Sequence, residues 1–114
     1  LRSVSEKAIK DLENFDIKFY TSFEVLDNPK ILQNALRSAD YVSIDVDVID
    51  PAYAPEVGNP EPIGLTPHHI ISAIISSKPI AIDFVEAVPS SGTTATAILV
   101  ATLIREALIV LARS

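Results

Sequence analysis

Apolar residues follow two patterns along this chain, one typical of strands and one typical of helices. Three short runs are rich in β-branched and aromatic residues, and they predict strands at residues 17–22, 41–48 and 79–87. Between and after these runs the apolar residues recur at helical spacing. The helices predicted from that spacing run from Ser3 or Ser5 to about Asn14, and over residues 29–38, 66–77 and 94–112.

The order of these segments predicts the fold class. Strands that alternate with helices are typical of βαβ units, in which a parallel sheet is covered by helices on both faces. Residues 50–64 interrupt the alternation, and their Pro and Gly content predicts a long irregular loop. We therefore expect an α/β protein, a three-layer α/β/α fold with a mainly parallel sheet. The chain would supply three strands and their helices.

Composition narrows the possible partners. The chain has 114 residues and a net charge of -6, with nine Lys and Arg against fifteen Asp and Glu, so nucleic acid is not an expected partner. Because there is no Cys, any metal ligands must be carboxylates or imidazoles, and an intracellular, cytoplasmic location is expected. The chain contains no Met and begins at Leu1. We therefore expect it to be part of a longer protein.

The last predicted helix raises the question of a membrane span. Residues 95–112 are apolar enough to resemble a short span, but Arg105 and Glu106 lie near the middle. Each charge would cost about 2.5 to 3.5 kcal/mol at the centre of a membrane helix. We therefore expect a helix packed on the sheet and no membrane association.

Two carboxylates near the end of the second predicted strand are the first candidates for chemistry. Side chains alternate along a strand, so Ser43, Asp45 and Asp47 should point to the same side. Two ionised carboxylates this close repel each other unless protonation, a basic partner or a cation offsets the charge. Hard divalent ions such as manganese or magnesium favour such oxygen ligands. Spacing alone leaves open a solvated Asp beside one that caps the next loop.

The residues that follow show a resemblance to a known family. Residues 43–55 read SIDVDVIDPAYAP, and residues 58–66 read GNPEPIGLT. These segments resemble the signature of the ureohydrolases, the arginase and agmatinase family. A second segment, IDFVEAVP at residues 82–89, resembles the D-x-x-E-x-x-P motif of the same family. The chain therefore looks like the C-terminal portion of a single ureohydrolase domain, spanning residues 1–114.

This resemblance implies a reaction and a set of site residues. It implies a hydrolase that cleaves a guanidino or amidino C–N bond and releases urea, with two Mn2+ ions in the complete enzyme. Asp45 would bridge the two ions, Asp47 would chelate one of them, and Glu86 would bind the guanidinium of the substrate. The partner implied is a small guanidino compound such as agmatine or arginine, and the P-E-P sequence favours agmatinase-like members. Homo-oligomers, trimers or hexamers, are also implied.

Other polar residues are predicted to have structural roles. Asp50 is expected to stabilise the turn before Pro51, and Asp83 to support the site or the fold. His68 and His69 adjoin at a helix start and are expected to be surface or capping residues. Tyr53 and Glu61 could shape the substrate entrance. Residues 90–94 fit either an anion site or an ordinary helix cap.

The chain lacks part of the family's pattern. The D-A-H-x-D segment and the further His that complete the metal site in this family are not in the sequence, so we expect the 114 residues alone to be inactive. Ile63 stands where the family has a Gly, and this restricts the backbone at the pocket entrance. The alternative is a non-catalytic member or interaction module that keeps the fold without a complete metal cluster. A generic nucleotide-binding domain is disfavoured because no glycine-rich phosphate loop follows a strand.

Overall fold

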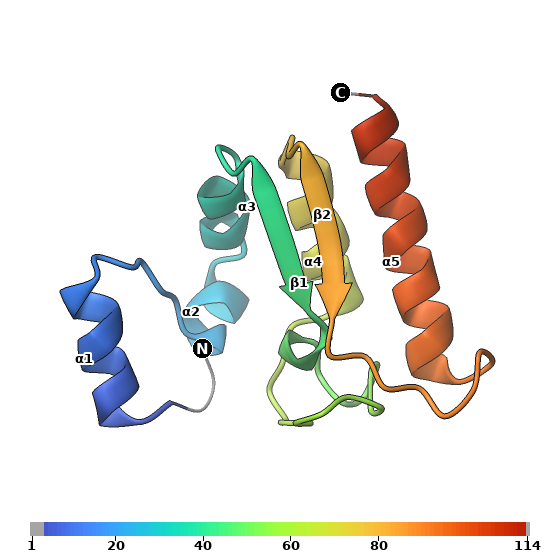
Figure 1. Ribbon diagram of the computed structural model, residues 1–114, viewed down its shortest axis with the longest axis horizontal. Coiled ribbons are helices and arrows are strands. Elements are labelled where there is room, and N and C mark those ends of the chain that lie inside the picture. Colours follow the sequence, from blue (N-terminus) through green and yellow to red (C-terminus); the bar gives the residue numbers. More distant parts are fainter. Residues whose placement is uncertain (1–3, 114) are drawn as a thin grey trace.

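The structure is a computed structural model that describes residues 4–113 (Figure 1). Two parallel strands form its sheet, and helices α3 and α4 lie behind it in the view of Figure 1, with α5 beside β2. The elements in chain order are α1 (Glu6–Asn14), α2 (Ser22–Asp27), α3 (Lys30–Leu36), β1 (Tyr41–Asp45), a short 3-10 helix η1 (Val46–Val48), α4 (Pro67–Ser76), β2 (Ala81–Val85) and α5 (Ala95–Ala112).

The sheet and α4 form one βαβ unit, as the sequence predicts. β1 pairs with β2 in parallel, with Ser43 opposite Asp83 and Asp45 opposite Val85. Val42 and Ile44 alternate with exposed neighbours along β1 and face the core. They join apolar residues of α4 and α5 in a single buried cluster, whose largest fully buried members are Val46, Ile49, Ile74 and Leu103. The fold is therefore α/β with a parallel sheet.

The predicted helix starts are confirmed by their caps. Ser5 accepts a hydrogen bond from Ala8 N–H, Thr66 from His69 N–H, and Thr94 from Ala97 N–H. Each bond satisfies one of the backbone donors that the first turn of a helix leaves without a partner. The helix predicted over residues 29–38 is also present, as α3.

The strand predicted over residues 17–22 is wrong for the described part of the chain. Thr21 caps α2 in a capping box: its hydroxyl accepts from Glu24 N–H, and the Glu24 carboxylate accepts from Thr21 N–H at 2.7 Å. The helix therefore begins at Ser22. Residues 17–20 take no regular secondary structure. The sequence carried the signal for this helix, since Thr21-x-x-Glu24 is the capping-box pattern.

The two confirmed strands are shorter than predicted. β1 ends at Asp45 because the carboxylate of Asp45 accepts the Asp47 N–H at 2.9 Å, which turns the backbone into a 3-10 helix. The face of the sheet that carries Tyr41 and Ser43 is exposed to solvent. Helices of the described residues thus cover one face of the sheet, where the sequence predicts cover on both.

Helix α5 is apolar on several sides. By length and composition alone it is apolar enough to cross a membrane, with a mean hydropathy of 2.0. In the structure it packs against α4 and β2 and buries Leu103 and Ala107. Arg105 and Glu106 form an ion pair at 2.9 Å on its surface. The arrangement is that of a helix packed on a sheet.

Candidate metal and substrate site

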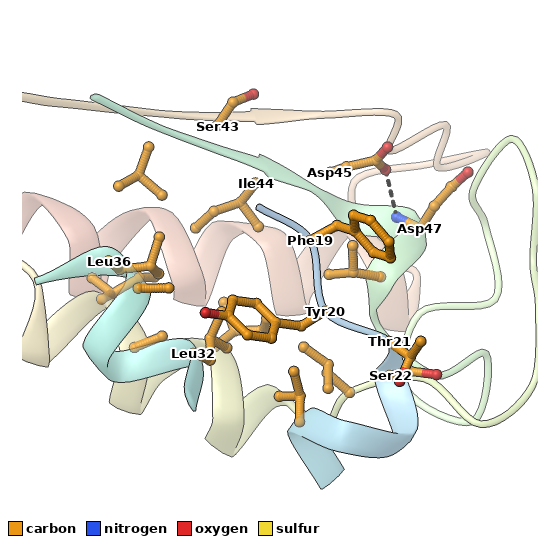
Figure 2. A pocket seen from close by; sticks show the side chains of 18 of the residues that line it. Phe19, Tyr20, Thr21, Ser22, Leu32, Leu36, Ser43, Ile44, Asp45 and Asp47 are labelled. Carbon is orange, nitrogen blue, oxygen red and sulfur yellow. Dashed lines mark hydrogen bonds between the residues drawn. The ribbon is translucent and has the colours of Figure 1, made fainter. Parts of the chain in front are cut away.

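Asp45 and Asp47 lie together at the carboxyl end of β1 (Figure 2). One oxygen of Asp45 accepts the Asp47 N–H, and Oδ2 of Asp47 accepts the Asn59 N–H at 3.2 Å. The other Asp47 oxygen, Oδ1, is buried and has no hydrogen-bond partner among residues 4–113. A buried carboxylate oxygen without a partner is costly, and a cation would satisfy it. The pair therefore fits a divalent metal ion.

The donor set is incomplete in this chain. Within the described residues, no group of three or more His, Cys, Asp and Glu side chains is placed to hold a metal ion. Two carboxylates provide a fraction of the six or more oxygen and nitrogen ligands that hard divalent ions take. Further ligands must come from elsewhere if a metal is to be held tightly.

Asp50 anchors the long loop that follows β1. Its Oδ1 accepts the Ala52 N–H at 2.9 Å and its Oδ2 accepts the Gly64 N–H at 3.0 Å, so one carboxylate ties both ends of the loop together. Gly64 is needed for this closure, because a Cβ there would lie 2.4 Å from the Asp50 nitrogen. The turn-stabilising role predicted for Asp50 agrees with this geometry.

Ile63 occupies the strained position of the loop. Its φ is 63°, in the left-handed region that β-branched residues avoid. The backbone thus has the conformation that a Gly would favour, even though the residue is Ile. The surrounding hydrogen bonds of Asp50 and Leu65 hold this conformation, since Asp50 N–H donates to Leu65 O at 2.9 Å.

Glu86 follows directly after β2, so it lies at the carboxyl end of the parallel strands, as Asp45 does. Because Asp45 lies opposite Val85, Glu86 is next to the end of β1. Its side chain is exposed, and its Oε2 lies 3.2 Å from where a Cβ on Gly58 would be, so the carboxylate sits over the loop. Its φ of 66° is a second left-handed conformation. Strained backbone of this kind concentrates at functional sites.

A link that the sequence did not suggest joins the loop to the segment carrying Glu86. The Glu56 carboxylate accepts bonds from Ser90 Oγ at 2.6 Å and from Ser90 N–H at 3.2 Å, and these lower the pKa of Glu56. Glu56 N–H donates to the buried Thr96 hydroxyl, and Val88 N–H donates to Glu56 O. Neither residue spacing nor hydrophobic pattern gives a signal for such contacts, because Glu56 lies far from all three partners in the sequence, 34 residues from Ser90 and 40 from Thr96.

Asp83 fastens β1 to β2. Ser43 Oγ donates to Asp83 at 2.6 Å, and the Tyr41 hydroxyl donates to the same carboxylate. The Ser43 bond first, and the Tyr41 bond second, lower the pKa of Asp83, while the bond to Asp83 raises the pKa of Tyr41. Asp83 thus has the supporting role predicted for it.

The histidines and the segment before α5 take part in capping. His69 Nδ1 accepts the Thr66 N–H at 3.1 Å, which completes a capping box at the start of α4. His68 Nε2 lies 3.4 Å from Ser72 Oγ on the exposed side of the same helix. Within residues 90–94, Thr94 is the cap of α5. These contacts agree with capping and give no ligand role to either histidine.

Comparison with known proteins places the chain in a family. A model of the arginase family matches residues 1–110. The chain belongs to the arginase family. An uncharacterised 32.2 kDa protein of Methanothermus fervidus is 40% identical over 92 residues, which cover 75% of this chain and 32% of that protein. The mitochondrial agmatinase of Gallus gallus is 44% identical over 75 residues, which cover 62% of this chain and 22% of that enzyme.

The fold is confirmed as arginase-like by a solved structure. The crystal structure of the agmatine ureohydrolase of Thermoplasma volcanium superposes with a TM-score of 0.85 at 33% identity, covering 98% of this chain and 40% of that one. The chain spans about a third or less of the curated arginase-family relatives described above. It therefore has the fold of one part of a ureohydrolase.

Proposed function

We propose that this chain forms part of the active site of a manganese-dependent ureohydrolase that acts on a guanidino compound, with agmatine favoured over arginine. The observation that carries this proposal is the buried Oδ1 of Asp47, which lacks a partner among the described residues and lies beside Asp45. The family of the chain and the agmatinase among its relatives support the reaction class. The preference for agmatine rests on the P-E-P sequence at residues 60–62.

The roles of the residues follow from their positions. Asp45 and Asp47 would hold manganese through their carboxylate oxygens. When bound, the metal supplies a water of lowered pKa as the nucleophile. Glu86, exposed at the same edge of the sheet, would pair with the forked N–H donors of a guanidinium and fix the orientation of the substrate. The left-handed backbone of Glu86 and the close approach of its side chain to Gly58 would keep this carboxylate in place.

The setting of this activity is part of the same proposal. The remaining metal ligands would come from the rest of a ureohydrolase domain, and the working enzyme would be a cytoplasmic homo-oligomer. A non-catalytic member of the family is the second candidate. It is favoured by one observation, that the described residues bring together no three potential metal ligands.

The test is manganese-dependent urea release from agmatine and from arginine by the complete protein that contains this chain. Asp47→Ala should lower kcat/KM by about 100-fold or more, because it removes a metal ligand. Glu86→Gln should lower kcat/KM by about 10- to 100-fold, the loss of one charge-assisted pair. Glu13→Gln removes an exposed carboxylate of α1 and is the matched control, with unchanged activity.

The outcomes separate the two candidates. Urea release that Asp47→Ala abolishes and Glu13→Gln preserves would support the ureohydrolase. If the manganese-loaded complete protein releases no urea from either compound, the non-catalytic member becomes the leading account.

A further inference from the structure

A short antiparallel contact joins the long loop after β1 to the segment after β2. Val57 and Ala87 form an antiparallel bridge, and Val88 N–H donates to Glu56 O at 3.0 Å. The two segments therefore run beside each other in opposite directions, beyond the carboxyl ends of the strands (Figure 1).

This contact lies between two parts of the candidate site. On the loop, the N–H of Asn59 donates to Oδ2 of Asp47 at 3.2 Å. On the other segment, Glu86 directly precedes Ala87, and its Oε2 lies 3.2 Å from the position that a Cβ on Gly58 would take. The contact therefore links the candidate substrate ligand to a candidate metal ligand.

The side chain of Glu56 extends the contact to Ser90. Oε1 of Glu56 accepts from Ser90 Oγ at 2.6 Å and from Ser90 N–H at 3.2 Å. The N–H of Glu56 donates at 3.0 Å to the hydroxyl of Thr96, which is fully buried. The hydroxyl of Ser90 first, and that of Thr94 second, lower the pKa of Glu56. The carboxylate is therefore ionised at neutral pH, and hydrogen bonds to an ionised acceptor are the stronger kind.

Glu86 needs support of this kind because its backbone is held in an unfavourable conformation. Its φ of 66° lies in the left-handed region, which is disfavoured for a residue with a Cβ. Such a conformation persists only where the surrounding structure holds it. The residues that directly follow Glu86 are those that contact the loop, and Glu56 bonds to two of them, Val88 and Ser90.

We propose that Glu56 is a positioning residue, which holds the carboxylate of Glu86 in the orientation that binds a guanidinium group. This inference rests on the proposed function, because it takes Glu86 as the substrate ligand. Glu56 acts through Glu86 and not on the substrate, since Ser90 occupies its Oε1 and its Oε2 is buried.

The test measures KM and kcat for manganese-dependent urea release by the complete protein that contains this chain, with agmatine or arginine, whichever it hydrolyses faster. Glu56→Ala removes the acceptor for Ser90 and should raise KM by about 10-fold, because Glu86 is then free to shift. Glu56→Gln keeps an oxygen that accepts both bonds from Ser90, so the rise in KM should be less than about 3-fold.

A control separates positioning from a purely structural role. Thr66→Ala removes the hydroxyl that caps α4, away from Glu86 in the sequence and in its bonds. It should lower the free energy of unfolding and leave KM unchanged. A destabilising substitution lowers the amount of folded enzyme, and so the apparent kcat, without changing the affinity of the molecules that remain folded.

A double substitution asks whether Glu56 acts through Glu86. Glu86→Ala removes the carboxylate that is to be positioned. Adding Glu56→Ala to it should therefore cause no further fall in kcat/KM, whereas independent effects would multiply.

The outcomes distinguish this inference from the proposed function. If the original protein releases urea and Glu56→Ala lowers kcat alone, the inference is overturned and the proposed function stands. The same holds if Glu56→Gln impairs the enzyme as much as Glu56→Ala, or if the effects of Glu56→Ala and Glu86→Ala multiply. If the manganese-loaded original protein releases no urea from either compound, both are overturned.

Discussion

The loop of residues 46–65 has little regular secondary structure but buries several side chains, whereas the N-terminal segment of residues 4–20 contains a regular helix that buries none. The loop is irregular, yet Val46, Ile49 and Ala54 within it are fully buried, and Asp50 hydrogen-bonds to both of its ends. The N-terminal segment contains a regular, well-capped helix, yet that helix buries no residue. Regular backbone hydrogen bonds therefore do not by themselves pack a segment against the core.

The difference lies in where each segment finds its partners. The loop obtains hydrogen bonds from within itself and from the segment that precedes and begins α5, and its apolar contacts come from the described core. The N-terminal segment has an amphipathic helix and exposed aromatic residues, and this helix buries none of its side chains against the described residues. Substitutions on the two sides of this comparison should therefore differ in their effects on the stability of the chain.

The largest effect is expected at Gly64. Gly64→Ala would place a Cβ 2.4 Å from the Asp50 nitrogen and 2.6 Å from its Cα, and these backbone atoms cannot move without opening the loop. We expect a loss of about 3 kcal/mol in the free energy of unfolding, the upper end for overpacking. Urea denaturation measures it. Gly92→Ala is the matched control, since no atom lies within 4 Å of its added Cβ, and equal effects of the two substitutions would contradict the account.

A smaller effect of opposite sign is expected at Ile63. The left-handed backbone of this residue costs about 1 to 2 kcal/mol for a residue with a Cβ. Ile63→Gly removes that cost but adds chain entropy to the unfolded state, so we expect a net gain of about 0.5 to 1 kcal/mol in the same assay. Ile63→Asn, a residue that tolerates this conformation, should fall between the two. Destabilisation by Gly would show that Ile63 is held by contacts rather than strained.

The smallest effect is expected in the N-terminal segment. Phe15 is 75% exposed, so Phe15→Ala should change the free energy of unfolding of the isolated chain by less than about 0.5 kcal/mol. Leu103→Ala, at a fully buried position, calibrates the assay with an expected loss of about 2 to 5 kcal/mol. A loss of similar size at Phe15 would mean that the N-terminal segment packs on the core of this chain after all.

Much of the fold follows from signals that are local in sequence. Caps at Ser5, Thr66 and Thr94 mark helix starts through bonds that span three residues, so the residue types alone reveal them. The strand predicted at residues 17–22 is wrong because aromatic and β-branched residues fit a strand environment but do not by themselves create one. Pairing within the chain decides whether a strand forms there, and the capping box at Thr21 redirects the backbone.

The candidate site divides in the same way. The motif positions Asp45, Asp47 and Glu86 could be named from the sequence, and the structure brings their segments to one edge of the sheet. Their roles in metal and substrate binding stay predictions. Sequence reasoning missed the bond from Asn59 to Asp47 and the link between Glu56 and Ser90, because such contacts depend on how distant loops pack. The end of β1 at Asp45 was missed for a local reason: the Asp45 carboxylate accepts the Asp47 N–H, and the strand ends there.

The most direct test of the central claim, that Asp45 and Asp47 bind a divalent metal, is a titration of the 114-residue chain with Mn2+. Paramagnetic broadening of the backbone amide signals reports which residues lie near the ion. The account predicts that residues 45–47 and Asn59 broaden first, and that Asp47→Asn removes this selectivity. Broadening that begins instead at the acidic residues of α1, and is the same in Asp47→Asn, would contradict it.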